Sequence, residues 1–169
     1  EHRADHATAV IYGYWAGLPD DGYHWHYRPG VSAGVIPTTA GPTGGLRHCV
    51  FASMPPARLK GAGSSGLTAR YREVLAENAP ALAGMLETCR LDGRLTAFAG
   101  RPGFLRQAAG PGWALVGDAG YFKDPITAHG MTDALRDAEF LADAAAAGTA
   151  TAFAGYGRLR DALSLPLLH

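Results

Sequence analysis

The sequence has few of the features that mark secreted, membrane-bound or nucleic-acid-binding proteins. Two cysteines, Cys49 and Cys89, are too few for a disulfide framework and indicate free thiols in a reducing compartment. No run approaches the roughly 18 consecutive apolar residues of a membrane-spanning helix, and the polar residues 1–6 do not form a signal peptide. With 15 basic and 15 acidic residues the formal net charge is zero, which gives no excess of positive charge for nucleic acid. These absences predict a cytoplasmic protein that binds neither a membrane nor a nucleic acid.

The most informative stretch opens with a short apolar run, residues 113–116. The run ends in a β-branched residue and is bounded by glycines, so it predicts a buried strand. Residues 117–120, Gly-Asp-Ala-Gly, predict a tight turn in which the backbone comes close to another group. The turn places the carboxylate of Asp118 at the end of the strand, where open α/β sheets bind their ligands.

A loop and a helix follow this turn. An Asp-Pro pair at 124–125 and a His-Gly pair at 129–130 punctuate the loop. Over residues 131–145 apolar residues recur three and four positions apart, which predicts a helix with one apolar stripe that ends at Gly148. The start of a helix offers unpaired backbone N–H groups and about half a positive charge. Together with the carboxylate, these groups suit a ligand with hydroxyls and an anionic end, such as a reduced flavin.

Residues 117–139 resemble the second FAD motif of the aromatic-hydroxylase flavoproteins, the single-component FAD monooxygenases related to para-hydroxybenzoate hydroxylase. The resemblance implies that Asp118 binds the hydroxyls of the ribityl chain or ribose and that Pro125 packs near the isoalloxazine ring. It also implies that the backbone from Ala128 to Met131 faces the N1/O2 edge of the ring. His129 stands where the family has glutamine or leucine, so the resemblance gives its side chain no role. The predicted cofactor-binding residues are Gly117, Asp118, Pro125, Ala128, His129, Gly130 and Met131.

The same resemblance implies a G-x-G-x-x-G loop, after a first strand, that holds the pyrophosphate of the cofactor. These letters occur only at Gly61, Gly63 and Gly66, in a glycine-rich linker that follows two prolines and no strand. A second glycine-rich run, at 41–45, is typical of a hairpin turn. We therefore predict that the chain corresponds to the middle and C-terminal part of such a flavoprotein, a fragment without the ADP-binding start.

The first half of the chain predicts an antiparallel sheet. Four segments with strand patterns are joined by short turns, which indicates a meander: residues 8–15, 23–28, 31–37 and 45–53. Helices at 65–78 and 80–89 and a returning strand at 91–99 are predicted next. A last helix, at 151–165, is predicted to turn Phe153, Tyr156, Leu159 and Leu163 inward. In the family such a sheet forms a substrate domain whose face covers the flavin.

Three side chains are candidates for binding a small-molecule substrate. Trp25 and Tyr27 alternate onto one face of their strand, where they either line an aromatic pocket or pack in a core. Arg106 lies in the loop 100–112, where family members often place a residue that contacts substrate or flavin; a solvated loop residue is the other interpretation. His24 and His26 share the opposite face, but with no third ligand nearby they predict no metal site.

The predicted fold class is α/β (α+β): an antiparallel substrate-domain sheet with helices over residues 1–110, and the C-terminal strand, loop and helix of an FAD-binding domain over residues 111–169. The resemblance implies an FAD-dependent oxidoreductase, a monooxygenase that hydroxylates a small organic substrate. In this family the flavin, reduced by NAD(P)H, captures oxygen as a C4a-hydroperoxide, and few side chains act as acid or base.

Two alternatives remain open from the sequence: a truncated, non-catalytic binding domain, and a flavin-dependent reductase or halogenase. The tryptophan-rich signature of halogenases is incomplete, because the segment at Trp25 lacks the second tryptophan. An incomplete site must still meet the entropic cost of immobilising FAD, so the chain alone is expected to bind FAD weakly or not at all. An apolar seam is expected where the missing N-terminal half would dock, which favours that partner or self-association.

Overall fold

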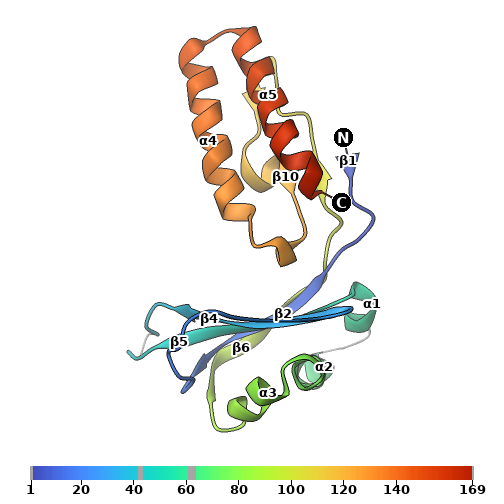
Figure 1. The fold of residues 1–169 in the computed structure, drawn as a ribbon, viewed down its shortest axis with the longest axis vertical. Helices are drawn as coiled ribbons and strands as arrows, with labels where there is room; N and C mark the ends of the chain where they lie inside the picture. Colours follow the sequence, from blue (N-terminus) through green and yellow to red (C-terminus); the bar gives the residue numbers. More distant parts are fainter. Residues whose placement is uncertain (1, 42–43, 61–63, 169) are drawn as a thin grey trace. The chain divides into compact units, whose positions relative to one another are not determined.

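A computed structural model of the chain describes residues 2–41, 44–60 and 64–168. The chain divides into two compact units, and Figure 1 shows the elements of each. Unit 1 combines Glu1–Ala7 with Arg101–His169, and unit 2 is Thr8–Gly100. The predicted division between residues 110 and 111 falls inside unit 1. Each unit has hydrophobic core clusters of its own.

Unit 2 is built on a five-stranded antiparallel sheet with the strand order β3-β4-β5-β2-β6 (Figure 1). Its strands are β2 (Ala9–Ala16), β3 (His24–Arg28), β4 (Val31–Thr38), β5 (Arg47–Met54) and β6 (Arg90–Phe98). All five predicted strands are present. The predicted meander is confirmed only for β3, β4 and β5, because β2 pairs with β5 and β6 instead of β3. The connection over residues 17–23 exceeds the roughly two to five residues of a hairpin loop, and it carries the chain across the sheet.

Helices α2 (Ser64–Asn78) and α3 (Pro80–Leu86) cover one face of this sheet, and the short α1 (Pro56–Leu59) precedes them (Figure 1). Successive side chains of a strand point to opposite faces of the sheet, so every second side chain faces the helices. In β2, for example, Ile11 and Trp15 are buried with Tyr71 and Leu75 of α2. The indole of Trp15 donates to the Tyr71 hydroxyl at 3.1 Å, and this hydroxyl donates to the Val50 carbonyl oxygen at 3.1 Å.

Both predicted helices of unit 2 are confirmed, although α3 ends earlier than predicted. Pro80 opens α3 at its first turn, where a missing N–H costs nothing. Residues 61–63, which include two glycines of the G-x-G-x-x-G letters, lie outside the described residues. The same holds for residues 42 and 43 of the glycine-rich turn.

Unit 1 places two helices, α4 (Gly130–Ala147) and α5 (Ala150–Ser164), beside a set of short strands (Figure 1). Strands β1 (His2–Arg3), β7 (Phe104–Leu105) and β10 (Tyr121–Phe122) form an antiparallel sheet, and β8 (Ala109–Gly110) pairs with β9 (Trp113–Ala114). Three 3-10 turns complete the unit: η1 (Gly117–Ala119), η2 (Pro125–Thr127) and η3 (Leu165–Leu167). As predicted, α4 ends at Gly148, which is left-handed with φ 67°. Within the described chain, no helix combines the length and apolarity that crossing a membrane requires.

Two predictions about unit 1 are wrong. The run 113–116 is not a buried strand: only Trp113–Ala114 pair as a strand, their partner β8 is equally short, and Trp113 is 45% exposed. On α5, Leu159 and Leu163 are 45% and 42% exposed instead of inward. Tyr156 is buried as predicted, and the inward stripe continues with polar side chains, Arg160 and Ser164, which find hydrogen-bond partners there.

Candidate flavin site

The two parts of the predicted cofactor motif lie against each other in unit 1. Gly117 has φ 58°, a left-handed conformation that glycine adopts without steric cost. A β-carbon on Gly117 would lie 3.1 Å from the Ala134 methyl group, so the turn packs on the second turn of α4. A β-carbon on Gly130 would lie 3.9 Å from Oδ1 of Asp118. The Gly-Asp-Ala-Gly turn and the start of α4 therefore form one surface.

This surface joins an acceptor to a group of donors. The Asp118 side chain is exposed and makes no hydrogen bond or ion pair with any described residue. The N-cap of α4 is His129, and within the described chain no side chain caps the first N–H groups of this helix. A carboxylate and uncapped N–H groups thus lie beside each other, an arrangement that would suit a molecule with hydroxyls and an electron-rich edge.

The loop before α4 is held in a strained conformation. The Asp124 carboxylate accepts a hydrogen bond from the Ile126 N–H at 3.0 Å, which fixes η2 with Pro125 in its first position. Ala128 follows with φ 54°, and it is the one non-glycine residue with positive φ among residues 2–41, 44–60 and 64–168. A left-handed backbone costs such a residue about 1–2 kcal/mol. Strain of this kind persists where the surrounding structure imposes it, often at a ligand site.

A cluster of buried charges lies behind this loop, and the sequence analysis missed it. Lys123 has a side chain only 4% exposed and forms an ion pair with Asp133, which is 8% exposed. Asp133 also accepts from Arg136 at 3.0 Å, and Arg136 bonds Asp137 at 2.7 Å. The ammonium of Lys123 lies 4.9 Å from the centre of the Tyr121 ring. The cluster connects β10 and the loop to the first two turns of α4.

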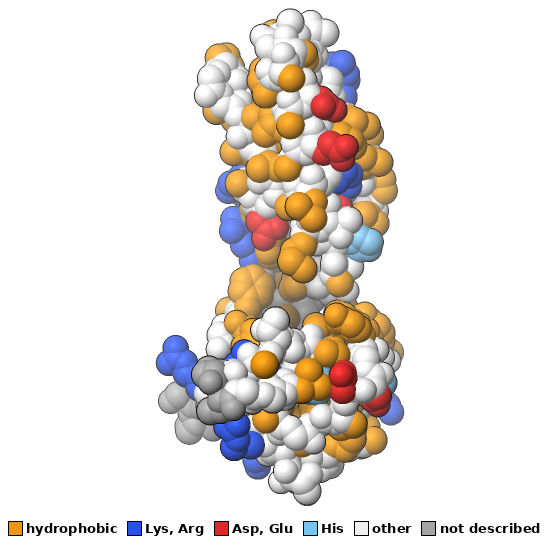
Figure 2. All heavy atoms as spheres, turned by 90° about the vertical axis from the view of Figure 1, so that its left-hand side faces the viewer, with side chains coloured by type: hydrophobic (Ala, Val, Ile, Leu, Met, Phe, Trp, Pro, Cys, Tyr) orange, Lys and Arg blue, Asp and Glu red, His pale blue; other side chains and the backbone are white. Residues whose placement is uncertain are grey.

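These charges, and not the predicted apolar stripe, occupy the buried face of α4. Its buried residues are Asp133, Asp137 and Ala144, whereas Met131 and Leu135 of the predicted apolar stripe are 84% and 75% exposed. Figure 2 views this side of unit 1 and shows hydrophobic side chains at its surface. The sequence does contain a signal for this polar face. Asp133 and Asp137 are four residues apart, and residues at this spacing lie on the same side of a helix.

Trp25 and Tyr27 lie on the sheet face of unit 2 that is opposite α2 and α3. Their rings stack with centroids 6.3 Å apart and planes at 8°. The ring centroids of Trp25 and Phe51 are 5.0 Å apart. Trp25 is 38% exposed and Tyr27 is 59% exposed, so neither belongs to the hydrophobic core. The structure therefore leaves an accessible aromatic cluster at this position.

Arg106 lies in unit 1 and contacts the Asp118 turn. Its Nη1 donates to the Ala119 carbonyl oxygen at 3.0 Å, and its backbone N–H donates to the Gly120 carbonyl oxygen at 2.8 Å. The guanidinium lies over the Phe104 ring at 4.4 Å. Arg106 thus bonds the predicted flavin turn itself.

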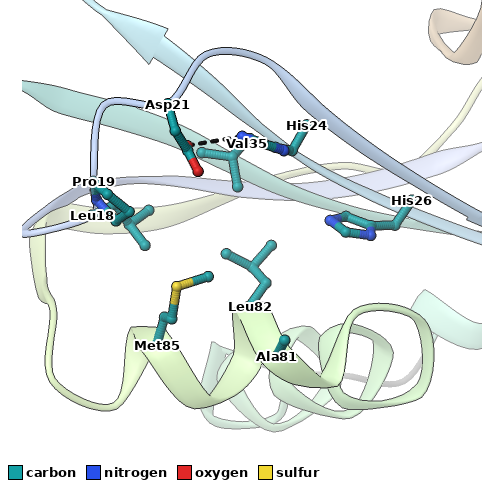
Figure 3. Close-up of a pocket in the computed structure, with 9 residues that line it drawn as sticks. All are labelled: Leu18, Pro19, Asp21, His24, His26, Val35, Ala81, Leu82 and Met85. Atoms are coloured by element: carbon teal, nitrogen blue, oxygen red, sulfur yellow. Dashed lines mark hydrogen bonds and ion pairs between the residues drawn. The ribbon is translucent and has the colours of Figure 1, made fainter.

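His24 and His26 face the helix side of unit 2, at the rim of a cavity of about 120 Å³ (Figure 3). Figure 3 shows Leu82 and Met85 of α3 pointing into this cavity from below the sheet. His24 Nε2 lies 2.8 Å from Oδ1 of Asp21. In the part of the chain that the structure describes, no three His, Cys, Asp or Glu side chains are grouped so that they could hold a metal ion.

Among the solved structures that this chain is similar to are flavin-dependent proteins. The flavin-dependent brominase Bmp2 matches with a TM-score of 0.77 at 16% identity, over 92% of this chain and 40% of its own. PqsL, a probable FAD-dependent monooxygenase from Pseudomonas aeruginosa, matches with a TM-score of 0.69 at 24% identity, over 99% of this chain and 48% of its own. HpxO from Klebsiella pneumoniae, solved with FAD and uric acid, matches with a TM-score of 0.72 at 20% identity, over 99% and 44%. No family model and no curated protein matches the sequence.

The chain therefore has the fold of part of the flavin-dependent monooxygenases and halogenases. The predicted fold class, a mixed α/β flavoprotein fold with an antiparallel sheet, is confirmed. The chain spans less than half of each of these three solved chains.

Proposed function

We propose that this chain supplies the flavin-contacting part of an FAD-dependent oxidoreductase, and that the enzyme is a monooxygenase acting on a small organic molecule. The observation that carries the proposal is the single surface formed by Asp118 and the uncapped start of α4. The residues fit a flavin, since a carboxylate suits the ribityl hydroxyls and backbone N–H groups suit the electron-rich edge of the ring. When bound and reduced, the flavin would supply the oxygen-activating chemistry.

The protein's own part is binding and orientation. Asp118 accepts hydrogen bonds from the sugar-alcohol chain of the cofactor, and the N–H groups at Gly130 and Met131 donate to the ring edge. Gly130 would leave the space beside Asp118 open to the cofactor, Gly117 lets the turn pack on α4, and Pro125 would lie beside the ring. The strained backbone at Ala128 supports this assignment, because it lies between Pro125 and the start of α4. No acid–base pair is required of the protein.

A planar, aromatic or heteroaromatic substrate suits unit 2. The stacked rings of Trp25 and Tyr27, with Phe51, offer an exposed surface on which such a molecule can stack. HpxO and PqsL were solved with uric acid and 2-aminobenzoylacetate, both of which contain such rings. Electrons for the flavin would come from NAD(P)H.

Halogenation is the second candidate function. It is favoured by the fold shared with the brominase Bmp2, whose TM-score is higher than that of PqsL or HpxO. The missing second tryptophan after Trp25 counts against it. Product analysis with and without bromide distinguishes the two, because only a halogenase makes its product dependent on the halide.

The exposed apolar side of α4 supports the proposal that a further part of the enzyme docks there. Met131 and Leu135 together present bare hydrophobic surface next to the candidate flavin site. A nucleotide-binding βαβ segment with G-x-G-x-x-G would both cover this surface and hold the pyrophosphate of FAD. Self-association of the chain is the alternative use of the same surface.

Co-expression tests the proposal. Purified alone, the chain is expected to be colourless, since the pyrophosphate has no binding loop in it. Co-expressed with a βαβ segment from the same genome that carries G-x-G-x-x-G, it is expected to co-purify with FAD and to consume oxygen with NAD(P)H. A stable complex that holds no flavin would contradict the proposed function and favour a non-catalytic binding domain.

A further inference from the structure

An arginine on α5 is buried completely beside the flavin turn. Arg160 is 0% exposed, although arginine is rarely buried without partners. Its Nη2 donates to the carbonyl oxygen of Arg106, and its Nε and Nη2 bond Oδ1 of Asp161 at 3.0 and 2.7 Å. Burying a guanidinium is costly, so its retention here needs a reason beyond the ion pair with Asp161.

Arg106 extends this connection to the turn. It holds two successive carbonyl oxygens, that of Ala119 with its Nη1 and that of Gly120 with its backbone N–H. The Gly120 N–H in turn donates to the Gly117 carbonyl oxygen at 2.9 Å and closes η1. The hydrogen bonds therefore run without a break from α5 through Arg106 to the turn that carries Asp118.

Arg160 also touches the turn directly. A β-carbon on Gly120 would lie 2.9 Å from Nη1 of Arg160 and 2.9 Å from the Leu115 β-carbon. This Nη1 is buried and has no hydrogen-bond partner among the described residues. The guanidinium thus contacts a position where a β-carbon would collide with Arg160 Nη1 and with Leu115.

From these contacts we propose that Arg160, acting through Arg106, is a positioning residue for flavin binding. It fixes the Ala119 and Gly120 carbonyls and so directs the Asp118 carboxylate toward the start of α4. The inference rests on the proposed flavin function, because the group that Asp118 would bind is the ribityl chain. Arg160 itself is fully buried and acts only through the turn.

Hydrogen exchange of the full chain tests the structural half of this inference without any flavin. In Arg160→Met, the amide hydrogens of Arg106 and Gly120 are expected to exchange at least about tenfold faster, because they close the held turn. Arg158→Met, at an exposed arginine on the same helix, is the matched control and should leave both rates unchanged. Wild-type exchange of these two amides in Arg160→Met would overturn the inference. So would an equal acceleration throughout α4, which indicates a general loss of stability.

A double-mutant cycle tests the functional half, with riboflavin 5′-phosphate titrated into the full chain and binding followed by NMR. Arg160→Met is expected to weaken binding about tenfold, but to weaken it no further in an Asp118→Ala background. Additive losses would overturn the inference, because Arg160 would then act independently of Asp118. If Asp118→Ala alone binds as tightly as wild type, the proposed flavin site fails, while the exchange experiment still decides whether Arg160 holds the turn.

A second variant covers the case in which Arg160→Met does not fold. Arg106→Met removes an exposed guanidinium, its bond to the Ala119 carbonyl oxygen and its contact with the Phe104 ring, and keeps the backbone N–H that donates to Gly120. It is expected to speed exchange of the Gly120 amide and to weaken riboflavin 5′-phosphate binding about threefold, again with no added loss in Asp118→Ala. Wild-type behaviour of Arg106→Met in both measurements would overturn the inference.

Discussion

The carboxylate of Asp118 faces the first residue of helix α4: a β-carbon on Gly130 would lie 3.9 Å from Asp118 Oδ1. Twelve positions of sequence separate these residues, and the strained loop through Ala128 brings them together. The distance is ordinary van der Waals contact, so the folded chain itself does not require glycine at position 130. On the proposed function, glycine at this position would let the flavin approach the start of the helix closely.

Substitution of Gly130 is therefore expected to separate folding from binding. Gly130→Val should fold with nearly wild-type stability, because a β-carbon added there would meet only Asp118, at an ordinary contact distance. It should lose riboflavin 5′-phosphate binding, because the side chain occupies the space between Asp118 and the N–H groups. Thermal unfolding and NMR titration measure the two effects. Gly84→Val, at a helical glycine with open space around it, is the control and should bind like wild type.

The buried ion pair of Lys123 and Asp133 is expected to be sensitive to the loss of one partner. Lys123→Met leaves a buried carboxylate with only Arg136 beside it, and should cost unit 1 about 3 kcal/mol. Lys123→Met combined with Asp133→Leu should recover most of this loss, since no unpaired charge is left. Native-state hydrogen exchange of α4 reports the stability of unit 1.

A surface ion pair provides the control for the buried pair of Lys123 and Asp133. Arg70→Met removes a surface ion pair with Glu73 in unit 2 and should cost less than about 1 kcal/mol. If Lys123→Met is as mild as Arg70→Met, the buried cluster does not hold the loop in the way that its geometry indicates.

Tyr121 is expected to make unit 1 unstable in alkali. Burial, and secondly the negative charge of Asp133, raise the pKa of Tyr121 to about 12, against about 10 in an unfolded chain. The folded state thus favours the neutral phenol, which donates to the Ser164 carbonyl oxygen at 3.0 Å. Its stabilisation, up to roughly 2–3 kcal/mol, is complete below pH ~10 and is lost as the pH rises through ~12.

Tyr121→Phe tests the pH dependence. At neutral pH the variant should lose about 1 kcal/mol with the hydrogen bond to Ser164. Between about pH 9 and 12, the stability of this variant should fall less steeply than that of wild type, because it has no phenol to titrate. Stability curves of wild type and Tyr121→Phe with the same slope over this range would show that another group titrates instead.

Leu135 is expected to mediate association and to contribute little to folding. Leu135→Lys alters a side chain that is 75% exposed, so the unfolding free energy should change by less than about 0.5 kcal/mol. Sedimentation velocity should show less self-association of the chain, because a charge interrupts the apolar side of α4. Leu46→Lys, at a leucine of unit 2 that is 39% exposed, should not change the sedimentation profile. Equal association of Leu135→Lys and wild type would place the contact elsewhere.

Local patterns predicted the strands of unit 2 and the order of turn, loop and helix at the candidate site. The alternation at residues 24–28 correctly separates Trp25 and Tyr27 from His24 and His26, because successive side chains of a strand point to opposite faces. Gly148 likewise marks the end of α4, because few other residues accept its left-handed backbone.

The sequence of α4 places two aspartates on one face, but it does not by itself show that this face is the buried one. An apolar stripe normally faces a core, yet here Asp133 and Asp137 turn inward. Asp137 pairs with Arg136 of the same helix, but Asp133 also pairs with Lys123, which lies outside the helix, so part of the compensation depends on a tertiary contact. The same limit applies to β2, whose partners β5 and β6 are set by long-range pairing and not by the neighbouring turn.

The affinity of Asp118→Ala for riboflavin 5′-phosphate tests the flavin assignment most directly. The wild-type chain should bind weakly through the surface between Asp118 and α4, and Asp118→Ala should bind roughly 10- to 150-fold more weakly still. This factor corresponds to about 1.5–3 kcal/mol, the usual contribution of a hydrogen bond to a charged group. Asp143→Ala, at an exposed aspartate farther along α4, should bind like wild type. Equal affinities of wild type, Asp118→Ala and Asp143→Ala would contradict the assignment of Asp118 to the flavin.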